Sequence, residues 1–367
     1  MSTNVSGGPI LSLLIPIYNV ERYLRECLDS AVAQTLGDIE IICINDGSTD
    51  NSPAIIREYM ERDPRVKMID KANSGYGDSM NCGLDMARGT YVGILESDDV
   101  MALDALEKLV AAAKRWDADF AKANFDFYWS KPEERREFME LFTAKECDMP
   151  VHPSDSVDVF SLKPSIWSAV YRRDFLNRND IRFLPTPGAA FQDTSFTFKV
   201  FALADTAVYL HDSVLSYRQD NEGSSVNSPN KVHCVNDEYA EIHRWIVEDY
   251  AKTHEPRDVA KLLRFANIVK YDSYMWSYTR LNPTFHAEFL ERMSQEFRAS
   301  LDAGEFELSD LKPWKRANLK AIVDDPQEWL AESSDFAGAG AFGRARHYAR
   351  LGGLGVVVAY VLDALKR

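Results

Sequence analysis

Strand and helix signals alternate from residue 10 to about residue 126, and this alternation limits the fold more than any other feature of the chain. Apolar, β-branched runs and helical spacing of apolar residues define the expected elements. We expect strands at 10–17, 39–44, 66–69 and 91–95, and helices at 20–33, 51–62, 79–87 and 101–116. Strands that alternate with helices usually pair in parallel. The sequence therefore predicts an α/β fold with a mostly parallel sheet flanked by helices.

Three carboxylates, Glu96, Asp98 and Asp99, directly follow the apolar run 91–95. They fall at the carboxyl end of a strand, where open parallel sheets bind their ligands. Glu96 and Asp98 point to the same side of an extended segment, so their oxygen atoms can hold a hard divalent ion that carries a phosphate. For Asp99 alone, capping the next helix is at least as good an interpretation.

Two other strand ends carry side chains that can contact a nucleoside. The carboxylate of Asp46 can accept hydrogen bonds from the imide of a uracil or from a ribose hydroxyl, or it can cap the next helix. Tyr18 either stacks on a base or belongs to the core. Neither G-x-x-x-x-G-K-[ST] nor G-x-G-x-x-G follows any of the expected strands, so a metal ion and loops would have to hold the phosphates.

Seven sequence blocks at these positions occur in one order within about the first hundred residues: Ile15–Leu24, Cys27–Ser30, Gln34–Thr35, Asn45–Asp50, Asn73–Gly75, Asn81–Leu84 and Glu96–Asp99. In this combination the chain resembles the N-terminal half of a family 2 glycosyltransferase. The resemblance implies a GT-A fold, a nucleotide-sugar donor that is usually a UDP-sugar, and sugar transfer with inversion at the anomeric carbon.

The resemblance also implies roles for single residues. Pro16, Tyr18 and Asp46 match the nucleoside contacts of the family, and Asn73 lies where the family often touches the nucleotide. The triplet Glu96-Ser97-Asp98 is similar to the family's D-x-D, in which the first acid faces the ribose and the last binds Mn²⁺ or Mg²⁺. Asp98 is therefore the expected metal ligand, and Glu96 replaces the first Asp.

Asp193 is the candidate catalytic residue, because it matches the family's general base. Inverting transfer needs a carboxylate that takes the proton from the acceptor hydroxyl. Asp193 could instead be the N-cap of a helix over 194–203. Gln192 stands where the family usually has Glu. Asp220 stands near the position of a metal-binding His in many relatives, so it is either a second metal ligand or a plain turn acid.

Trp167 resembles a tryptophan of the family that precedes an aromatic-rich helix. It either forms a wall for an acceptor sugar ring or belongs to the core. The dense aromatic run at 271–278 leaves the same two alternatives open, carbohydrate contact or packing between helices.

Composition limits the partners of the chain. A net charge of −15 argues against general nucleic-acid binding, which relies on basic surface. The five cysteines are scattered, and residues 1–9 have no apolar run of the kind found in secretory signals. These features favour a reducing cytoplasm.

We expect a GT-A domain over 1–228 with an insertion or acceptor flap at 126–165, a helical region over 229–335, and a tail over 336–367. Residues 338–367 contain five basic residues and one acid, a local charge of +4, around the apolar run 354–362. That run is too short to span a bilayer, which takes about 20 residues. The tail predicts peripheral attachment to the inner membrane face, or equally docking on the body or on a second subunit of a homo-oligomer.

The sequence thus predicts a metal-dependent, inverting hexosyl- or N-acetylhexosaminyltransferase with a glycan or lipid-linked acceptor, active in cell-surface polysaccharide or glycoconjugate synthesis. Two other functions stay open. Departures from the family pattern at Met80, Glu96, Gln192 and Asp220 suggest a non-catalytic nucleotide-sugar scaffold. A sugar nucleotidyltransferase would share the nucleotide-binding sheet, but the Gly-rich, Arg-containing loop after the first strand is absent.

Overall fold

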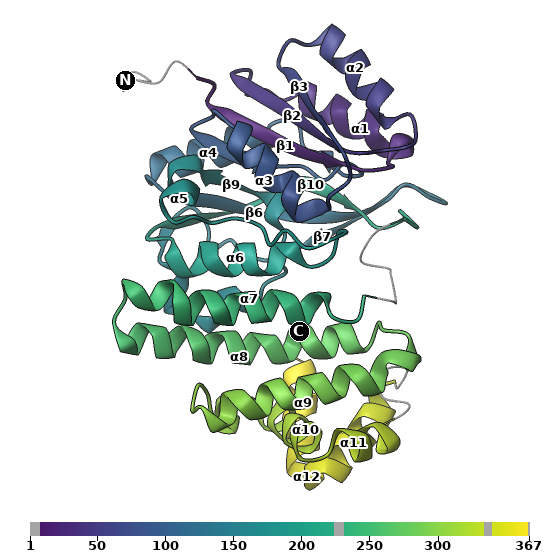
Figure 1. Cartoon of the computed structure of the whole chain (residues 1–367), viewed down its shortest axis with the longest axis vertical. Helices are drawn as coiled ribbons and strands as arrows, with labels where there is room; N and C mark the ends of the chain where they lie inside the picture. The colour runs from purple at the N-terminus through teal and green to yellow at the C-terminus, as the bar shows by residue number, and fades with distance from the viewer. Residues whose placement is uncertain (1–7, 224–230, 334–339, 366–367) are drawn as a thin grey trace. The chain divides into compact units, whose positions relative to one another are not determined.

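A ten-stranded sheet is the framework of residues 8–223 (Figure 1). The structure is a computed structural model, and the residues it describes are 8–223, 231–333 and 340–365. The strand order is β3-β2-β1-β4-β9-β6-β10-β5, with β7 beside β6 and β8 beside β10. Helices pack against the sheet, which confirms the predicted α/β fold. The strands are β1 Leu11–Ile17, β2 Ile39–Asp46, β3 Val66–Lys71, β4 Tyr91–Ile94, β5 Val100–Met101, β6 Phe120–Trp129, β7 Arg135–Met139, β8 Pro150–Val151, β9 Ala169–Arg172 and β10 Ala207–Arg218.

Strands β3, β2, β1 and β4 run parallel, as the sequence predicts. Every residue of β1 and β2 is buried, which explains why both sequences are largely apolar. Pro16 has no backbone N–H, and β1 tolerates it because pairing with β4 ends at Leu14, before that missing donor would be needed. The loops that follow these four strands therefore start from the same edge of the sheet.

The rest of the sheet is mixed, in contrast to the mostly parallel arrangement that the sequence predicts. β9 runs antiparallel between β4 and β6, while β6 and β10 are parallel to each other. β5 pairs antiparallel with β10. Residues 126–165 begin with the end of β6, which continues to Trp129 and forms a hairpin with β7.

Two helices of this unit start at positions other than those predicted. α4 begins at Ala105 instead of residue 101, because Val100 and Met101 pair with β10. α3 begins at Tyr76 instead of residue 79. A Cβ atom on Gly77 would lie 2.1 Å from the carbonyl oxygen of Leu184, so glycine allows this close approach. The helices are α1 Glu21–Val32, α2 Ser52–Arg62, α3 Tyr76–Met86, α4 Ala105–Arg115, α5 Arg173–Arg178 and α6 Gln192–Leu203.

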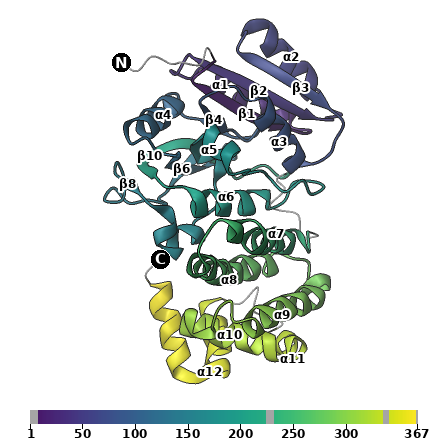
Figure 2. The same ribbon diagram turned by 60° about the vertical axis from the view of Figure 1, so that its left-hand side comes forward.

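Residues 224–367 form a second compact unit, and the elements described in it are helical (Figure 2). The tyrosines of the aromatic run, Tyr271, Tyr274 and Tyr278, are buried on α8, which supports packing between helices over carbohydrate contact. Across the residues described, no helix is both long and apolar enough to cross a membrane. The longer helices are α7 Cys234–Glu248, α8 Pro256–Tyr278, α9 His286–Asp302, α10 Pro313–Asp324, α11 Pro326–Glu332 and α12 Ala341–Ala364.

Candidate active site

The loops after β2 and β3 are joined by Asp46, the last residue of β2. Its carboxylate is buried, and Oδ1 accepts hydrogen bonds from the Ser74 amide (2.9 Å) and from Lys71 Nζ (2.5 Å). Oδ2 accepts one from the Gly75 amide at 3.0 Å. Asn73 donates to the backbone carbonyl of Asp46 at 3.0 Å. Asp46 therefore does not cap the next helix. Its contacts keep Asp46 and Asn73, two residues that the sequence predicts to contact the nucleotide, next to each other.

Tyr18 follows β1 and is 54% exposed, so the interpretation of this ring as a core residue is wrong. The next residue, Asn19, has a left-handed φ of 50°. Its Oδ1 accepts a hydrogen bond from the Thr49 amide at 2.8 Å, which ties the loop after β1 to the loop after β2. Pro16, in contrast, is buried within β1.

Glu96 begins the acid loop, which we define as residues 96–99. The hydroxyl of Tyr76 donates a hydrogen bond to Glu96 Oε1 at 2.6 Å. Burial raises the pKa of Glu96 to about 8; the Tyr76 bond opposes this shift, and the charges of Asp98 and Asp193 add to it. Tyr76 was not among the predicted site residues, because no local pattern links it to a partner twenty positions away.

Asp98 and Asp99 have different surroundings. Asp98 is partly exposed, and its Oδ2 accepts a hydrogen bond from Asn221 Nδ2 at 2.7 Å. Asp99 is fully buried; its Oδ1 accepts from the Arg218 amide at 2.8 Å. Burial raises the pKa of Asp99 well above its usual value. The helix-capping interpretation of Asp99 is wrong, since the N-cap of α4 is Asp104. Asp99 instead anchors the acid loop to β10.

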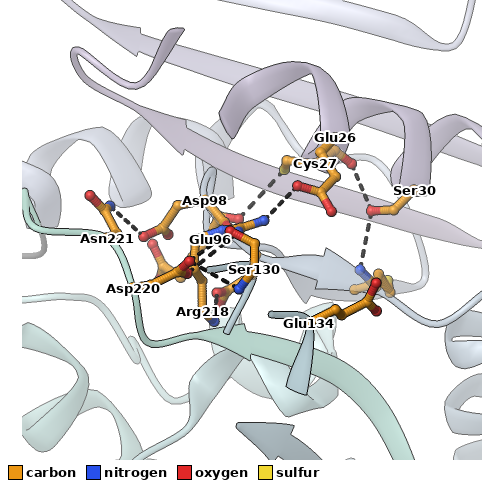
Figure 3. A network of polar contacts seen from close by, with 12 residues as sticks. Glu26, Cys27, Ser30, Glu96, Asp98, Ser130, Glu134, Arg218, Asp220 and Asn221 are labelled. Atoms are coloured by element: carbon orange, nitrogen blue, oxygen red, sulfur yellow. Dashed lines mark hydrogen bonds and ion pairs between the residues drawn. The ribbon is translucent and has the colours of Figure 1, made fainter. Parts of the chain in front are cut away.

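Arg218, the last residue of β10, links the acid loop to α1 (Figure 3). Its Nε donates to the Asp98 carbonyl at 2.7 Å, and its Nη2 lies 2.5 Å from Glu26 Oε2. The guanidinium carbon is 4.7 Å from the Tyr23 ring centre and 4.9 Å from that of Tyr128. The side chain is 1% exposed. This buried cation offsets part of the acidic charge around it, and the sequence analysis missed it because its partners are distant in the chain.

Asp98 and Asp220 present carboxylate oxygens in the same network (Figure 3). Asp220 Oδ2 accepts hydrogen bonds from the Ser130 amide (2.9 Å) and hydroxyl (2.6 Å). Asp220 Oδ1 is buried and makes no hydrogen bond; Arg218 Nη1 lies 3.5 Å away. An orphaned carboxylate oxygen close to a second carboxylate fits a hard divalent ion such as Mn²⁺ or Mg²⁺. Within the described part of the chain, no three His, Cys, Asp or Glu side chains are grouped to hold a metal by themselves.

Asp193 lies in the first turn of α6, which follows Phe191 with its left-handed φ of 64°. Phe191 is the N-cap, so the interpretation of Asp193 as a cap is wrong. Burial raises the pKa of Asp193 to about 6, while the positive charges of Lys163 and Lys122 lower it. Because Asp193 also raises the pKa of Glu96, these two carboxylates lie within electrostatic reach of each other.

Gln192 ties down the loop that precedes Asp193. Its side chain is 3% exposed; Nε2 donates to Thr186 Oγ1 at 2.9 Å and Oε1 accepts from the Ala190 amide at 2.6 Å. A glutamate at this position could not donate when ionised. The amide therefore has a structural reason to replace the family's usual Glu.

We expect Gln192→Glu to lower stability by about 1–3 kcal/mol at pH 7, because it buries a charge at a side chain that is 3% exposed and removes the amide donor to Thr186 Oγ1. The loss should shrink as the pH falls and the new carboxyl becomes protonated, since the protonated form can donate again. Urea unfolding at pH 5 and pH 7 measures this difference. Gln295→Glu, at an exposed position on α9, is the matched control. Equal midpoints for the Gln192 variant and the parent chain at pH 7 would contradict the assignment.

Trp167 is 6% exposed and stacks on Tyr217, with ring centres 4.8 Å apart and planes at 22°. It also meets Phe125 edge to face at 4.6 Å. Tyr217 is the more exposed ring of the stacked pair. An acceptor sugar would therefore meet Tyr217 first, with Trp167 behind it.

Known proteins resemble this chain in sequence and in fold. Residues 12–177 match the family model "Glycosyl transferase family 2". The "Uncharacterized glycosyltransferase EpsJ" of Bacillus subtilis (strain 168) is 30% identical over 237 residues, which cover 61% of this chain and 64% of that protein. The hyaluronan synthase of Pasteurella multocida is 39% identical over 105 residues, which cover 29% of this chain and 11% of that protein. This chain thus spans less than two thirds of the length of either relative.

A crystal structure of S. aureus TarS 1–349 in complex with UDP-GlcNAc has a similar fold. The TM-score is 0.69 at 21% identity, over 88% of this chain and 91% of that one. At this level of identity the likeness concerns the fold, which is of the GT-A type. By the family model, residues 12–177 of this chain belong to glycosyl transferase family 2.

Proposed function

We propose that this protein transfers a sugar from a UDP-sugar to an acceptor hydroxyl with inversion, and that Asp193 is the general base. The observation that carries the proposal is a carboxylate with a pKa of about 6 within electrostatic reach of the acid loop. A base with a pKa near the working pH combines ionisation with basicity. The TarS complex supports a UDP-sugar as the donor class. We assign the nucleoside contacts to Tyr18, Asp46 and Asn73; a hydrogen bond joins the last two of these residues.

In the proposed reaction, Asp193 takes the proton of the acceptor hydroxyl as its oxygen attacks the anomeric carbon. The bond between that carbon and the diphosphate oxygen breaks, and its electron pair leaves with UDP. Attack from the face opposite the nucleotide inverts the configuration. Glu96, fixed by Tyr76, would face the ribose.

Asp98 and Asp220 are the residues that would hold Mn²⁺ or Mg²⁺, with diphosphate oxygens completing the coordination. The bound ion would supply positive charge against the negative charge that grows on the leaving diphosphate. In the structure, Asn221 covers one oxygen of Asp98, so we expect this amide to turn away when the cation binds.

A panel of UDP- and GDP-sugars, assayed for released nucleotide with and without Mn²⁺, tests the proposal. Release of UDP that depends on an added glycan acceptor supports transfer. Tight donor binding without turnover would indicate the non-catalytic scaffold, and release of pyrophosphate from UTP and a sugar phosphate would indicate a nucleotidyltransferase.

We further propose a role in cell-surface polysaccharide or glycoconjugate synthesis at the cytoplasmic face of a membrane. The name of the hyaluronan synthase relative supports a polysaccharide acceptor. The second support is α12, in which Gly352 and Gly353 interrupt the helix before the apolar run. After this break, an exposed apolar stripe has helical spacing: Leu354, Val358, Val361, Leu362 and Leu365.

The charged residues of α12 are compatible with binding to an anionic membrane surface. Asp363, the acid of the apolar segment, is 12% exposed and pairs with Lys312, so it turns away from the stripe. Arg344 and Arg346 are exposed on the first part of the helix. Residues 366 and 367, two of the basic residues in the prediction, lie outside the described residues.

We expect the triple variant Leu354→Ser, Val358→Ser, Leu362→Ser to lose binding to anionic vesicles that the parent chain retains. Each basic residue near such a surface contributes about 1 kcal/mol, so binding should weaken in high salt. Co-sedimentation with phosphatidylglycerol-containing and pure phosphatidylcholine vesicles measures it. If the parent chain does not sediment with anionic vesicles even in low salt, the membrane proposal fails. A fall in the mass of the triple variant in sedimentation equilibrium would instead assign the stripe to a homo-oligomer interface.

A further inference from the structure

Three partly exposed aromatic rings form a continuous row beside the proposed base. We call Tyr217, Phe127 and Trp129 the aromatic strip. The ring centres of Tyr217 and Phe127 are 6.2 Å apart, and those of Phe127 and Trp129 are also 6.2 Å apart. Phe127 and Trp129 stand two positions apart on β6, so they share one face of the sheet.

The strip starts at the catalytic centre. The residue after Tyr217 is Arg218, whose amide donates a hydrogen bond to Asp99 Oδ1 at 2.8 Å, so this end of the strip adjoins the acid loop. Burial raises the pKa of Tyr217, and the charges of Asp99, Asp98 and Asp193 also contribute to this shift. From Tyr217 the strip follows β6 toward its hairpin with β7. An acceptor that extends away from Asp193 would therefore meet the three rings in turn.

Positive groups lie over both ends of the strip, although the whole chain carries a net charge of −15. Lys163 Nζ is 5.0 Å from the Tyr217 ring centre and 6.0 Å from that of Phe127. At the other end, the guanidinium carbon of Arg135 is 3.8 Å from the Trp129 ring centre. Arg135 is exposed, so its charge can reach a ligand that lies on the rings.

Burial separates the strip from the core behind it. Phe125 and Trp167, which support Tyr217, are 0% and 6% exposed and fill the core. The rings of the strip are half-buried, so a part of each stays accessible to a ligand. Aromatic rings offer an apolar face to the C–H groups of a sugar, and nearby cations bind carboxylate or phosphate oxygens.

We propose that the aromatic strip is the acceptor subsite and that it takes a sugar bearing an anionic group, either a carboxylate or a phosphate. The sugar ring packs on Trp129 and Phe127, and the anionic group is held by Arg135 or Lys163. This inference rests on the proposed function, because it takes the strip to be the place where the acceptor of that reaction binds.

Saturation-transfer NMR on the full chain without donor tests the proposal independently of transfer. The probes are methyl β-D-glucuronide, glucose 6-phosphate and methyl β-D-glucoside. We expect the two anionic sugars to bind about tenfold more tightly than the neutral one, the difference that a charge-assisted hydrogen bond provides. A carboxylate preference or a phosphate preference then identifies the anionic group.

Variants locate the binding. Trp129→Ala should weaken all three sugars about tenfold through lost stacking, whereas Arg135→Gln should weaken just the anionic ones. Trp276 on α8 and Arg280 just after this helix provide matched controls, because the Arg280 guanidinium carbon lies 3.7 Å from the Trp276 ring centre in the same kind of pair. Trp276→Ala and Arg280→Gln should leave binding unchanged. Unchanged UDP binding in every variant checks that the fold is intact.

Two results would overturn the inference. Equal affinity for the neutral and anionic sugars in the parent chain would reject the anionic class, and parental affinity in Trp129→Ala would reject the strip as the subsite. If the sugars bind as expected but no donor is consumed, the proposed transfer fails and the subsite stands. If donor is consumed while these sugars do not bind, the subsite fails and the transfer stands.

Discussion

Asp193→Asn should reduce sugar transfer by about 10²–10⁴-fold and leave UDP-sugar binding unchanged, because a general base contributes this factor to the rate without holding the nucleotide. Asparagine keeps the shape of the side chain but cannot accept the proton. The measurements are the turnover rate at saturating acceptor and, by calorimetry, the dissociation constant of the donor. Asp174→Asn, at a side chain that is 82% exposed, is the matched control. Near-parental turnover in Asp193→Asn would place the base elsewhere.

The pH profile gives a second test of the same residue. The base acts in its ionised form, so kcat/KM should rise with pH up to about 6, the pKa of Asp193, and level off above it. Below this pKa, Asp193 is protonated and cannot take the proton of the acceptor hydroxyl, so kcat/KM falls as the pH falls. Lys163 and Lys122 lower this pKa, so Lys163→Met should move the rise to higher pH. A rise at the same pH in that variant would contradict the electrostatic coupling.

Asp98→Asn should remove the metal-dependent part of UDP binding. We expect the affinity of the variant for UDP to fall at least about tenfold, to the affinity of the parent chain in chelator. The amide oxygen introduced by this substitution can still accept the hydrogen bond from Asn221, so the fold should persist. Calorimetry of UDP with Mn²⁺ and with EDTA measures the effect, and thermal unfolding checks the fold. Asp104→Asn, an exposed acid just beyond the loop, is the control.

The parent chain by itself can reject the metal assignment. Equal UDP affinity in Mn²⁺ and in EDTA would mean that Asp98 and Asp220 do not hold a cation in the nucleotide complex. Arg218, with Nη1 3.5 Å from the orphaned oxygen of Asp220, would then supply the positive charge at this position.

Local sequence patterns predict the parts of the fold that depend on local chemistry. β1, β2 and β4 are largely apolar, and their carboxyl ends meet at one edge because parallel strands must point the same way. Glu96, Asp98 and Asp46 can therefore be placed at one edge from the sequence alone. The resemblance to the family adds Asp193, whose distance in sequence gives no local signal.

The remaining features depend on pairing between distant segments. β5 and β9 are too short for a periodic pattern, and the antiparallel insertion of β9 between β4 and β6 depends on tertiary packing. Tyr76 and Arg218 act through partners elsewhere in the chain, so an isolated tyrosine or arginine in the sequence does not reveal them. Trp129 falls within residues 126–165, which the sequence predicts as an insertion or acceptor flap, and the strand β6 is what reveals its position.

Arg218 affects whether the part of this chain that matches the family model could fold by itself. The family match ends at residue 177, yet the guanidinium that pairs with Glu26 and the amide that satisfies Asp99 both come from residue 218. A fragment cut at the end of the match would leave a fully buried carboxyl without its donor and the acid loop without the cation that holds it. Leaving a buried acceptor without its donor typically costs about 1–3 kcal/mol, a substantial share of the stability of a domain. The smallest piece of this protein with an intact acid loop must therefore extend through the end of β10.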